Sequence, residues 1–145
     1  MPIKTFRGLI ADGAQDTIVL HTNDGSTGYR IVKFEIMSTT PGVAFQASVI
    51  KIFTEQQSTV DAVVDFSDQR LLGASYLETH GAIQDANYRT DTVFESTRTF
   101  NQDIFVTHKD VQTGEACNYY IELEQVKLDL NENTVATLKD IRNLS

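Results

Sequence analysis

The chain has 145 residues but only one cysteine, two prolines and no tryptophan. A single cysteine excludes an internal disulfide, so the fold has to be stabilised by packing alone. The sequence has no C-x-x-C or H-x-x-x-H spacing, and its histidines, His21, His80 and His108, are far apart. Paired zinc ligands and nucleophile–base motifs are therefore missing. We predict no catalytic, cofactor-binding or metal-binding residue, and we expect the protein not to be an enzyme.

Positive charge and long apolar runs are also scarce. Lys and Arg number 12 against 20 Asp and Glu, which gives a net charge of −8. This acidic balance repels phosphate groups, so nucleic acid is not an expected partner. No apolar run approaches the roughly 18 residues that a membrane span needs. The first residues also lack the apolar stretch of a secretory signal. We therefore expect no membrane partner and no secretory leader.

Calcium and carbohydrate are both disfavoured as ligands. Asp61, Asp65 and Asp68, or Asn23 with Asp24, offer oxygen ligands for calcium, but their spacing matches no EF-hand loop. The lack of tryptophan weakens a carbohydrate-binding interpretation, because tryptophan is the residue that most often stacks on sugar rings. Candidates to replace it are Tyr76, Tyr88, Tyr119 and Tyr120.

The clearest pattern in the chain lies between Cys117 and Leu130. Apolar residues alternate with polar or acidic ones up to Gln125, after which the apolar positions change parity. This pattern predicts one long strand with a buried and a solvated face, and a β-bulge or a crossing between layers near Gln125. Cys117 is predicted to be a buried strand residue.

Shorter alternating or apolar segments predict further strands over residues 4–10, 16–21, 29–38, 45–53, 71–78, 93–99 and 104–108. The Asn-, Asp- and Gly-rich segment 22–28 predicts the turn of a hairpin. Gly73 indicates a bulge or a close approach of two backbones. Residues 55–70 fit either a helical turn or a connecting strand.

Residues 133–144 differ from the rest, because Val135, Leu138 and Ile141 follow helical spacing after an asparagine N-cap. They predict a short C-terminal helix that covers an open end of the fold or docks onto a neighbouring subunit. The sequence as a whole predicts an all-β protein: a single β-sandwich, jelly-roll-like, over residues 1–145. Residues 1–7 are expected to form an N-terminal arm, and residues 133–144 the helix.

Four stretches carry a resemblance to a known class of proteins. They are residues 7–13 (RGLIADG), residues 27–34 (TGYRIVKF), residues 65–68 (DFSD) with 71–73 (LLG), and residues 136–143 (ATLKDIRN). Together they resemble small virion structural proteins of tailed bacteriophages. The resemblance implies a non-enzymatic capsid decoration or cement protein in the virion, assembled in the host cytoplasm. A neck, tail or baseplate component, or a carbohydrate or host-surface binding module, is the alternative.

The implied partners are the major capsid protein or other virion proteins, and the chain itself as a homotrimer or another homo-oligomer. Contacts are expected from the N-terminal arm, from the polar loop at residues 79–90 and from the C-terminal helix, since long loops on β scaffolds often contact a partner. The interface candidates are Ile3, Phe6, Arg7, His80, Ile83, Tyr88, Arg89, Leu138 and Ile141.

Overall fold

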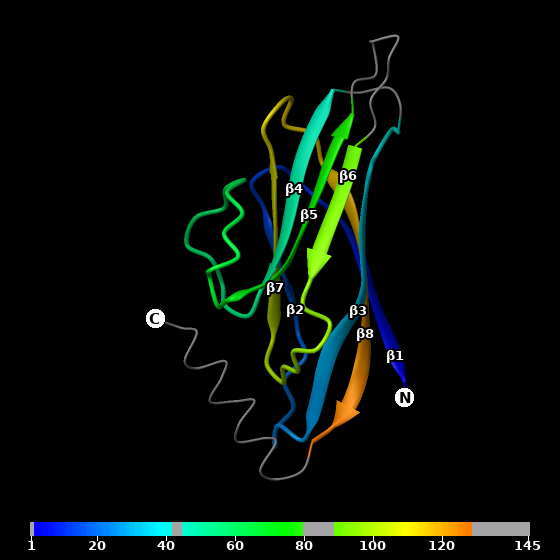
Figure 1. Ribbon diagram of the computed structural model, residues 1–145, viewed down its shortest axis with the longest axis vertical. Coiled ribbons are helices and arrows are strands. Elements are labelled where there is room, and N and C mark those ends of the chain that lie inside the picture. Colours follow the sequence, from blue (N-terminus) through cyan, green and yellow to red (C-terminus); the bar gives the residue numbers. More distant parts are fainter. Residues whose placement is uncertain (1, 42–44, 80–88, 129–145) are drawn as a thin grey trace.

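The protein is built from two antiparallel β-sheets, as the computed structural model in Figure 1 shows. The structure describes residues 2–41, 45–79 and 89–128. The smaller sheet has the order β1 (Ile3–Ile10), β8 (Cys117–Lys127), β3 (Thr27–Ser38). The larger sheet has the order β2 (Gln15–Ile18), β7 (Ile104–Asp110), β4 (Gln46–Phe53), β5 (Leu71–Thr79), β6 (Arg89–Phe94). The described part of the chain is therefore all-β, as predicted, and it holds no helix that could cross a membrane.

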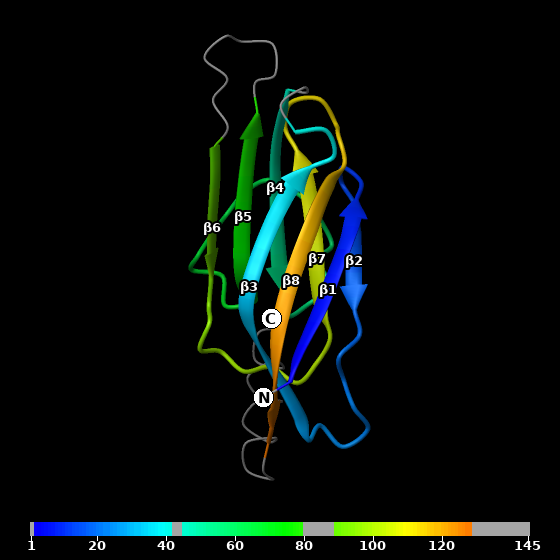
Figure 2. The same cartoon turned by 90° about the vertical axis from the view of Figure 1, so that its right-hand side faces the viewer.

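Three pairs of strands form between strands that lie at equal distances, counted in strands, from the two ends of the chain. The first strand pairs with the last, β2 pairs with β7, and β4 pairs with β5, all antiparallel. The strands β3 and β6 contact each other, although β6 forms its backbone hydrogen bonds with β5. This pattern arises when a long antiparallel hairpin is rolled up; β1, β3 and β8 form one layer, and β2 and β4 to β7 form the other. Figure 2 shows β3, β8 and β1 of the smaller sheet in front of strands of the larger one.

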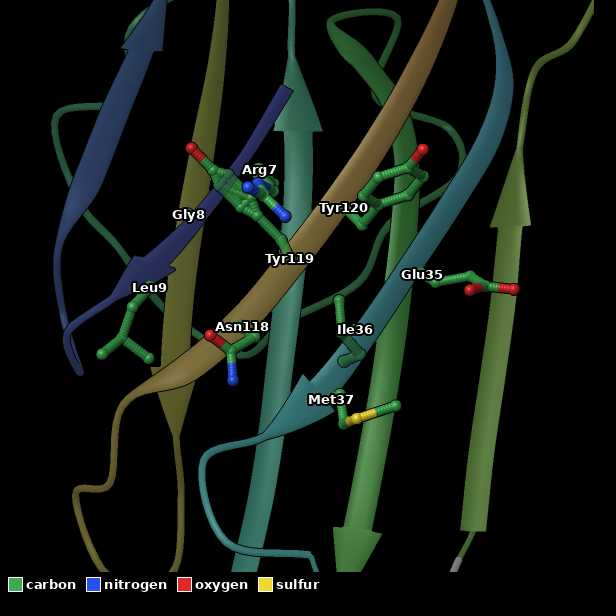
Figure 3. Close-up of a pocket in the computed structure, with 9 residues that line it drawn as sticks. All are labelled: Arg7, Gly8, Leu9, Glu35, Ile36, Met37, Asn118, Tyr119 and Tyr120. Carbon is green, nitrogen blue, oxygen red and sulfur yellow. The ribbon is translucent and has the colours of Figure 1, made fainter. Parts of the chain in front are cut away.

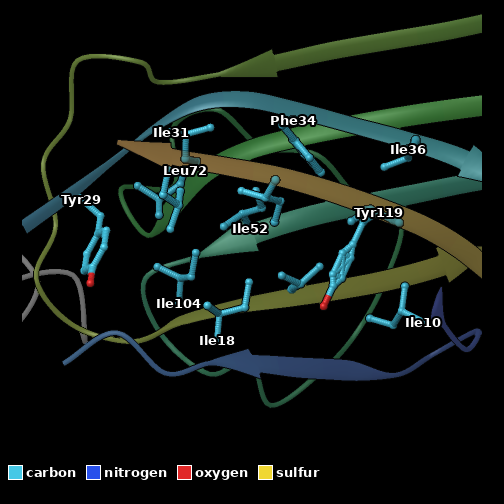
Figure 4. Close-up of a cluster of buried hydrophobic side chains, with 14 of the residues drawn as sticks. Ile10, Ile18, Tyr29, Ile31, Phe34, Ile36, Ile52, Leu72, Ile104 and Tyr119 are labelled. Carbon is cyan, nitrogen blue, oxygen red and sulfur yellow. The ribbon is translucent and has the colours of Figure 1, made fainter. Parts of the chain in front are cut away.

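A single hydrophobic core fills the space between the sheets (Figure 4). The side chains of β8 alternate, so that Tyr119, Ile121 and Leu123 point inward. They meet Ile50 and Ile52 of β4, which are fully buried. Burying one such side chain contributes about 1.5–3 kcal/mol. The interlocking of both sheets in one core makes the fold sandwich-like.

The predicted long strand is confirmed over Cys117–Lys127, but the irregularity lies in its partner. The pairing register of β3 against β8 shifts between Ile31 and Lys33, so Val32 is the extra residue. Strand β8 itself stays regular, and Leu128 is buried just beyond its end. When the apolar residues of a strand switch from one set of alternate positions to the other, the sequence does not reveal whether the extra residue lies in that strand or in its partner.

The prediction of a hairpin around residues 22–28 is wrong. This segment connects β2 in the larger sheet to β3 in the smaller one. Its turn chemistry is nevertheless as expected: Asp24 Oδ1 accepts a 3.0 Å hydrogen bond from the Ser26 N–H, and Gly25 has a φ of 68°. Local turn chemistry fixes a reversal of the chain but does not decide whether the flanking strands pair.

Other boundaries also differ from expectation. Residues 3–7 belong to β1 and pair with β8, so they do not form a separate arm. Strand β6 (Arg89–Phe94) begins and ends before the predicted 93–99. Residues 55–70 form neither helix nor strand but a loop over the outer face of the larger sheet. Gly73 has both predicted properties, because a register shift lies next to it and an added Cβ would be 2.8 Å from Phe94 Cβ. The predicted helix at 133–144 lies outside the described residues.

Candidate functional site

The outer face of the smaller sheet is the first candidate site. Directly opposed residues on neighbouring strands project to the same side of a sheet. The outward positions of the three strands form what we term the smaller-sheet face. It comprises Ile3, Thr5, Arg7, Leu9, Arg30, Lys33, Glu35, Met37, Asn118, Tyr120, Glu122 and Glu124. Leu9, Met37 and Ile3 expose 58%, 56% and 47% of their surface, so three large apolar side chains face solvent here.

The register arranges this face in rows across the sheet. Leu9 of β1, Asn118 of β8 and Met37 of β3 form one row. Arg7, Tyr120 and Glu35 form the adjacent row, with the tyrosine in the centre. A shallow cleft of about 540 Å³ lies over these two rows (Figure 3). One end of the face is thus apolar at both edges and polar in its middle.

The charges at this end are separated. Among the described residues, neither the Arg7 guanidinium nor the Glu35 carboxylate forms a hydrogen bond or ion pair. The β1 and β3 strands are about 10 Å apart, at roughly 4.8 Å for each strand spacing. Tyr120 lies between them, so this row has a positive and a negative end with an aromatic ring in between, and the Lys33 ammonium of β3 lies 5.7 Å from the centre of that ring.

The other end of the face is internally paired. Arg30 Nη2 lies 3.2 Å from a Glu124 carboxylate oxygen. The Tyr120 hydroxyl donates a 2.8 Å hydrogen bond to Glu122. This hydrogen bond is the main reason that the pKa of Tyr120 is raised above its usual value, and the nearby Arg7 charge acts in the opposite direction. The phenol therefore remains a neutral donor at neutral pH.

A second exposed apolar surface lies on the larger sheet. We term it the larger-sheet patch; it consists of Val63, Val64 and Phe66 of the 55–70 loop and Val93 of β6. Phe66 exposes 64% of its surface and, with Val64 and Val93, lines a small cleft beside Tyr76. Apolar side chains gathered in this way typically mark an interaction surface.

The larger-sheet patch is held in place by a buried lysine. Lys51 of β4 is only 5% exposed, and its Nζ donates to Asp61 Oδ1 at 2.9 Å and to the Val63 carbonyl at 2.6 Å. The hydrogen bond from Lys51 lowers the pKa of Asp61, and the opposite charge of the lysine adds to that effect. The loop is thus fastened to the sheet at the residues that precede Phe66.

The sequence-predicted interface residues are divided by the fold. Ile3 and Arg7 both lie on the smaller-sheet face, whereas Phe6 points inward and packs against the core. Arg89 lies at the start of β6 in the larger sheet and is not brought together with them. The remaining candidates, His80, Ile83, Tyr88, Leu138 and Ile141, lie outside the described residues.

Sequence reasoning named Tyr120 and Arg7 separately, as a possible stacking residue and as an interface candidate, but missed that they lie in one row with Glu35. Glu35 and Met37 were identifiable as neighbours on one side of their strand, but their proximity to Tyr120 and Leu9 depends on the order of the strands. Tyr119, proposed as a stacking residue, is instead in the core: it is 7% exposed, and its hydroxyl donates to Asp16 at 3.1 Å. Burial removes its ring from any exposed site.

The titratable groups of the core have structural partners. His108 is fully buried; its Nε2 lies 2.8 Å from Ser48 Oγ and its Nδ1 3.2 Å from the Ala11 carbonyl. Since a carbonyl only accepts, Nδ1 donates to the Ala11 carbonyl, and Nε2 forms the second hydrogen bond with the Ser48 hydroxyl. Cys117 is buried as predicted, and burial raises its pKa to about 11. Both side chains are inaccessible to a solute.

Other residues with possible ligand chemistry are dispersed. Asp103 Oδ1 lies 2.7 Å from His21 Nδ1 and also accepts the backbone N–H groups of Leu20 and His21. Within residues 2–41, 45–79 and 89–128, no three His, Cys, Asp or Glu side chains are grouped so that they could hold a metal ion. The smaller-sheet face and the larger-sheet patch therefore remain the candidate sites.

The chain matches no known family model, and no curated protein matches it significantly.

Proposed function

We propose that this protein is a non-enzymatic structural subunit of a virus particle: a capsid decoration or cement protein that stabilises a phage head by protein–protein contacts. The sequence resemblance to phage virion proteins supports this proposal. The strand pairing supports it as well, because the pairs β1 with β8, β2 with β7 and β4 with β5 resemble part of the pairing in a jelly roll, an architecture found in viral capsid and lectin domains. In this chain β6 departs from that pattern by pairing with β5.

The observation that carries the proposal is the presence of two exposed apolar surfaces on opposite layers. Leu9 and Met37 lie on the smaller-sheet face, and Phe66 and Val93 lie on the larger-sheet patch. A subunit with such surfaces on both layers can contact two neighbours at once, as a cement protein does in a shell. The net charge of −8 suits an outward position better than a surface that lines packaged DNA.

The test is the copy number of the chain in purified particles of the virus that encodes it. Decoration requires a fixed, high ratio to the major capsid protein, whereas a neck, tail or baseplate component is present in few copies. Mass spectrometry of intact particles measures this ratio. Absence of the chain from particles overturns the proposal.

A rebinding assay tests the contact itself. Recombinant chain is added to particles that lack it, and Phe66→Asp is compared with Val111→Asp. Both change an exposed apolar residue to aspartate, but Val111 lies outside the larger-sheet patch. We expect Phe66→Asp to reduce occupancy and Val111→Asp to leave it unchanged.

Carbohydrate binding is a second candidate function because of one observation. The cleft on the smaller-sheet face has an aromatic ring, Tyr120, flanked by the polar side chains of Arg7, Glu35 and Asn118. Ligand sites commonly combine an aromatic wall with a few polar groups that fix orientation. Glycan binding by the isolated chain that is lost in Tyr120→Ala, but retained in Tyr76→Ala, would establish it.

A further inference from the structure

We infer that the smaller-sheet face binds a second copy of this chain, in a two-fold pair whose axis runs along β8. This inference deepens the proposed function, because it names a partner for one of the two candidate surfaces. It follows from the arrangement of charges and apolar side chains across the sheet.

The face is complementary to itself. When two copies meet face to face about an axis parallel to β8, the β1 edge of one copy lies opposite the β3 edge of the other. Arg7 of each copy then meets Glu35 of its partner, in the same row. Leu9 of each copy meets Met37 of its partner in the adjacent row. A two-fold axis repeats every contact twice, so one pairing rule satisfies both edges.

The pairing gives partners to groups that have none among the described residues of a single copy. The Arg7 and Glu35 charges make no hydrogen bond or ion pair with the described residues of their own chain. The exposed Leu9 and Met37 side chains would be covered at the same time. Tyr120 and Asn118 lie on the axis and meet their own copies. Asn118 amides can pair with each other because each carries both a donor and an acceptor.

The contact is limited to one end of the face. Farther along the axis, Glu122 would meet Glu122 of the second copy, and like charges opposite each other are unfavourable. Packed sheets are rotated by about 30°, so their surfaces separate away from the centre of contact. Lys33 lies beside Glu122 in the register and partly offsets its charge.

The size of the face sets the expected affinity of one copy for the other. Even the whole face, with a width of three strands at about 4.8 Å each and a length of about seven residues at about 3.3 Å each, gives only roughly 330 Å² of flat area per copy. Stable interfaces bury about 800 Å² per partner. The isolated pair should therefore dissociate in the micromolar range or above, and many copies on one particle would strengthen it by avidity.

The decisive experiment is a charge exchange between two variants. Self-association of the wild-type chain is measured by sedimentation equilibrium from micromolar to submillimolar concentration. Arg7→Glu and Glu35→Arg should each weaken it about tenfold or more, because each places like charges opposite one another. An equimolar mixture of the two variants should associate again, since position 7 of each chain then faces an opposite charge at position 35 of the other.

Matched controls and a gain-of-association variant complete the test. Lys127→Glu and Glu115→Arg reverse exposed charges outside the paired rows and should leave association unchanged. Glu122→Gln should strengthen it severalfold, because it removes the like charges on the axis while keeping an acceptor for the Tyr120 hydroxyl. Recovered association in the mixture cannot result from misfolding of either variant.

A monomer at every concentration overturns the inference, and so does a trimer or any complex that is indifferent to both charge reversals. The isolated chain is used throughout. A failure to pair therefore leaves the copy-number test of the proposed function unaffected, and absence of the chain from particles leaves the pairing result unaffected.

Discussion

Gly8 lies against the ring of Tyr119: a β carbon added at residue 8 would be 3.1 Å from the tyrosine hydroxyl oxygen and 3.3 Å from its Cζ. The same hydroxyl donates a 3.1 Å hydrogen bond to Asp16, at the beginning of β2. Tyr119 belongs to the smaller sheet and Asp16 to the larger one. The missing side chain at residue 8 therefore leaves room for a polar link between the two layers.

Gly8→Ala should destabilise the protein by about 1–2 kcal/mol, because the methyl group and the tyrosine ring compete for the same space. Tyr119→Phe alone should cost about 1 kcal/mol through loss of the hydrogen bond. In the double variant, the cost of Gly8→Ala should be smaller than in the wild type, because the nearest atom has been removed. Urea denaturation of all four proteins measures this coupling, and strictly additive costs would contradict the proposed packing.

Asp110 should make the protein sensitive to acid. Burial acts to raise its pKa, but hydrogen bonds from the N–H groups of Gln112, Ala47 and Glu115 and from the Thr113 hydroxyl lower the pKa below its usual value overall. A carboxylate with a lowered folded-state pKa contributes stability above its unfolded pKa, near 3.8, and loses it as the pH falls through the folded value. Stability should therefore decrease below about pH 4.

The variant Asp110→Asn tests this assignment. It should lower stability at neutral pH by about 1–3 kcal/mol, and it should flatten the acid dependence in part. The flattening is incomplete because hydrogen bonds also lower the pKa of Asp61, Asp68 and Asp103. The control is Asp91→Asn, which changes an exposed carboxylate on β6. Equal profiles of stability against pH for Asp110→Asn and Asp91→Asn would argue against Asp110 as a source of the acid sensitivity.

Much of the fold could be predicted from local pattern, but not the neighbours of each strand. Period-two alternation is a property of one strand, so Cys117–Lys127 was found with its buried face. The mistaken hairpin at residues 22–28 and the missed row of Arg7, Tyr120 and Glu35 have a common cause. Both depend on which strands lie side by side, and that is decided by packing of the whole core rather than by neighbours in sequence.

Cys117 should react only when the protein unfolds. Its side chain is fully buried, and the burial raises the pKa of its thiol to about 11, so little thiolate is present at pH 8. We expect no labelling by a thiol reagent in native buffer and complete labelling in denaturant. The labelling rate over intermediate urea concentrations should follow the fraction unfolded measured by circular dichroism. Rapid labelling of the native protein would contradict the placement of this strand in the core.

The salt bridge between Lys51 and Asp61 should control the order of the 55–70 loop and hence of the larger-sheet patch. Asp61→Ala leaves the buried ammonium group with the Val63 carbonyl as its remaining partner in the loop, at a cost of about 1–3 kcal/mol. Hydrogen exchange should become faster at loop amides that do not donate to Asp61, such as that of Asp68, while the amides of β8 remain protected. Asp65→Ala is the matched control, because Asp65 accepts hydrogen bonds from Ser67 and none from Lys51. Loop exchange that is equally fast in Asp61→Ala and Asp65→Ala would mean that the lysine does not hold the loop, and that Phe66 is positioned by other contacts.

The low pKa of Asp61 adds a pH test of the same salt bridge. The Lys51–Asp61 salt bridge should be complete above about pH 4 and should be lost as the pH falls further and the carboxylate becomes protonated.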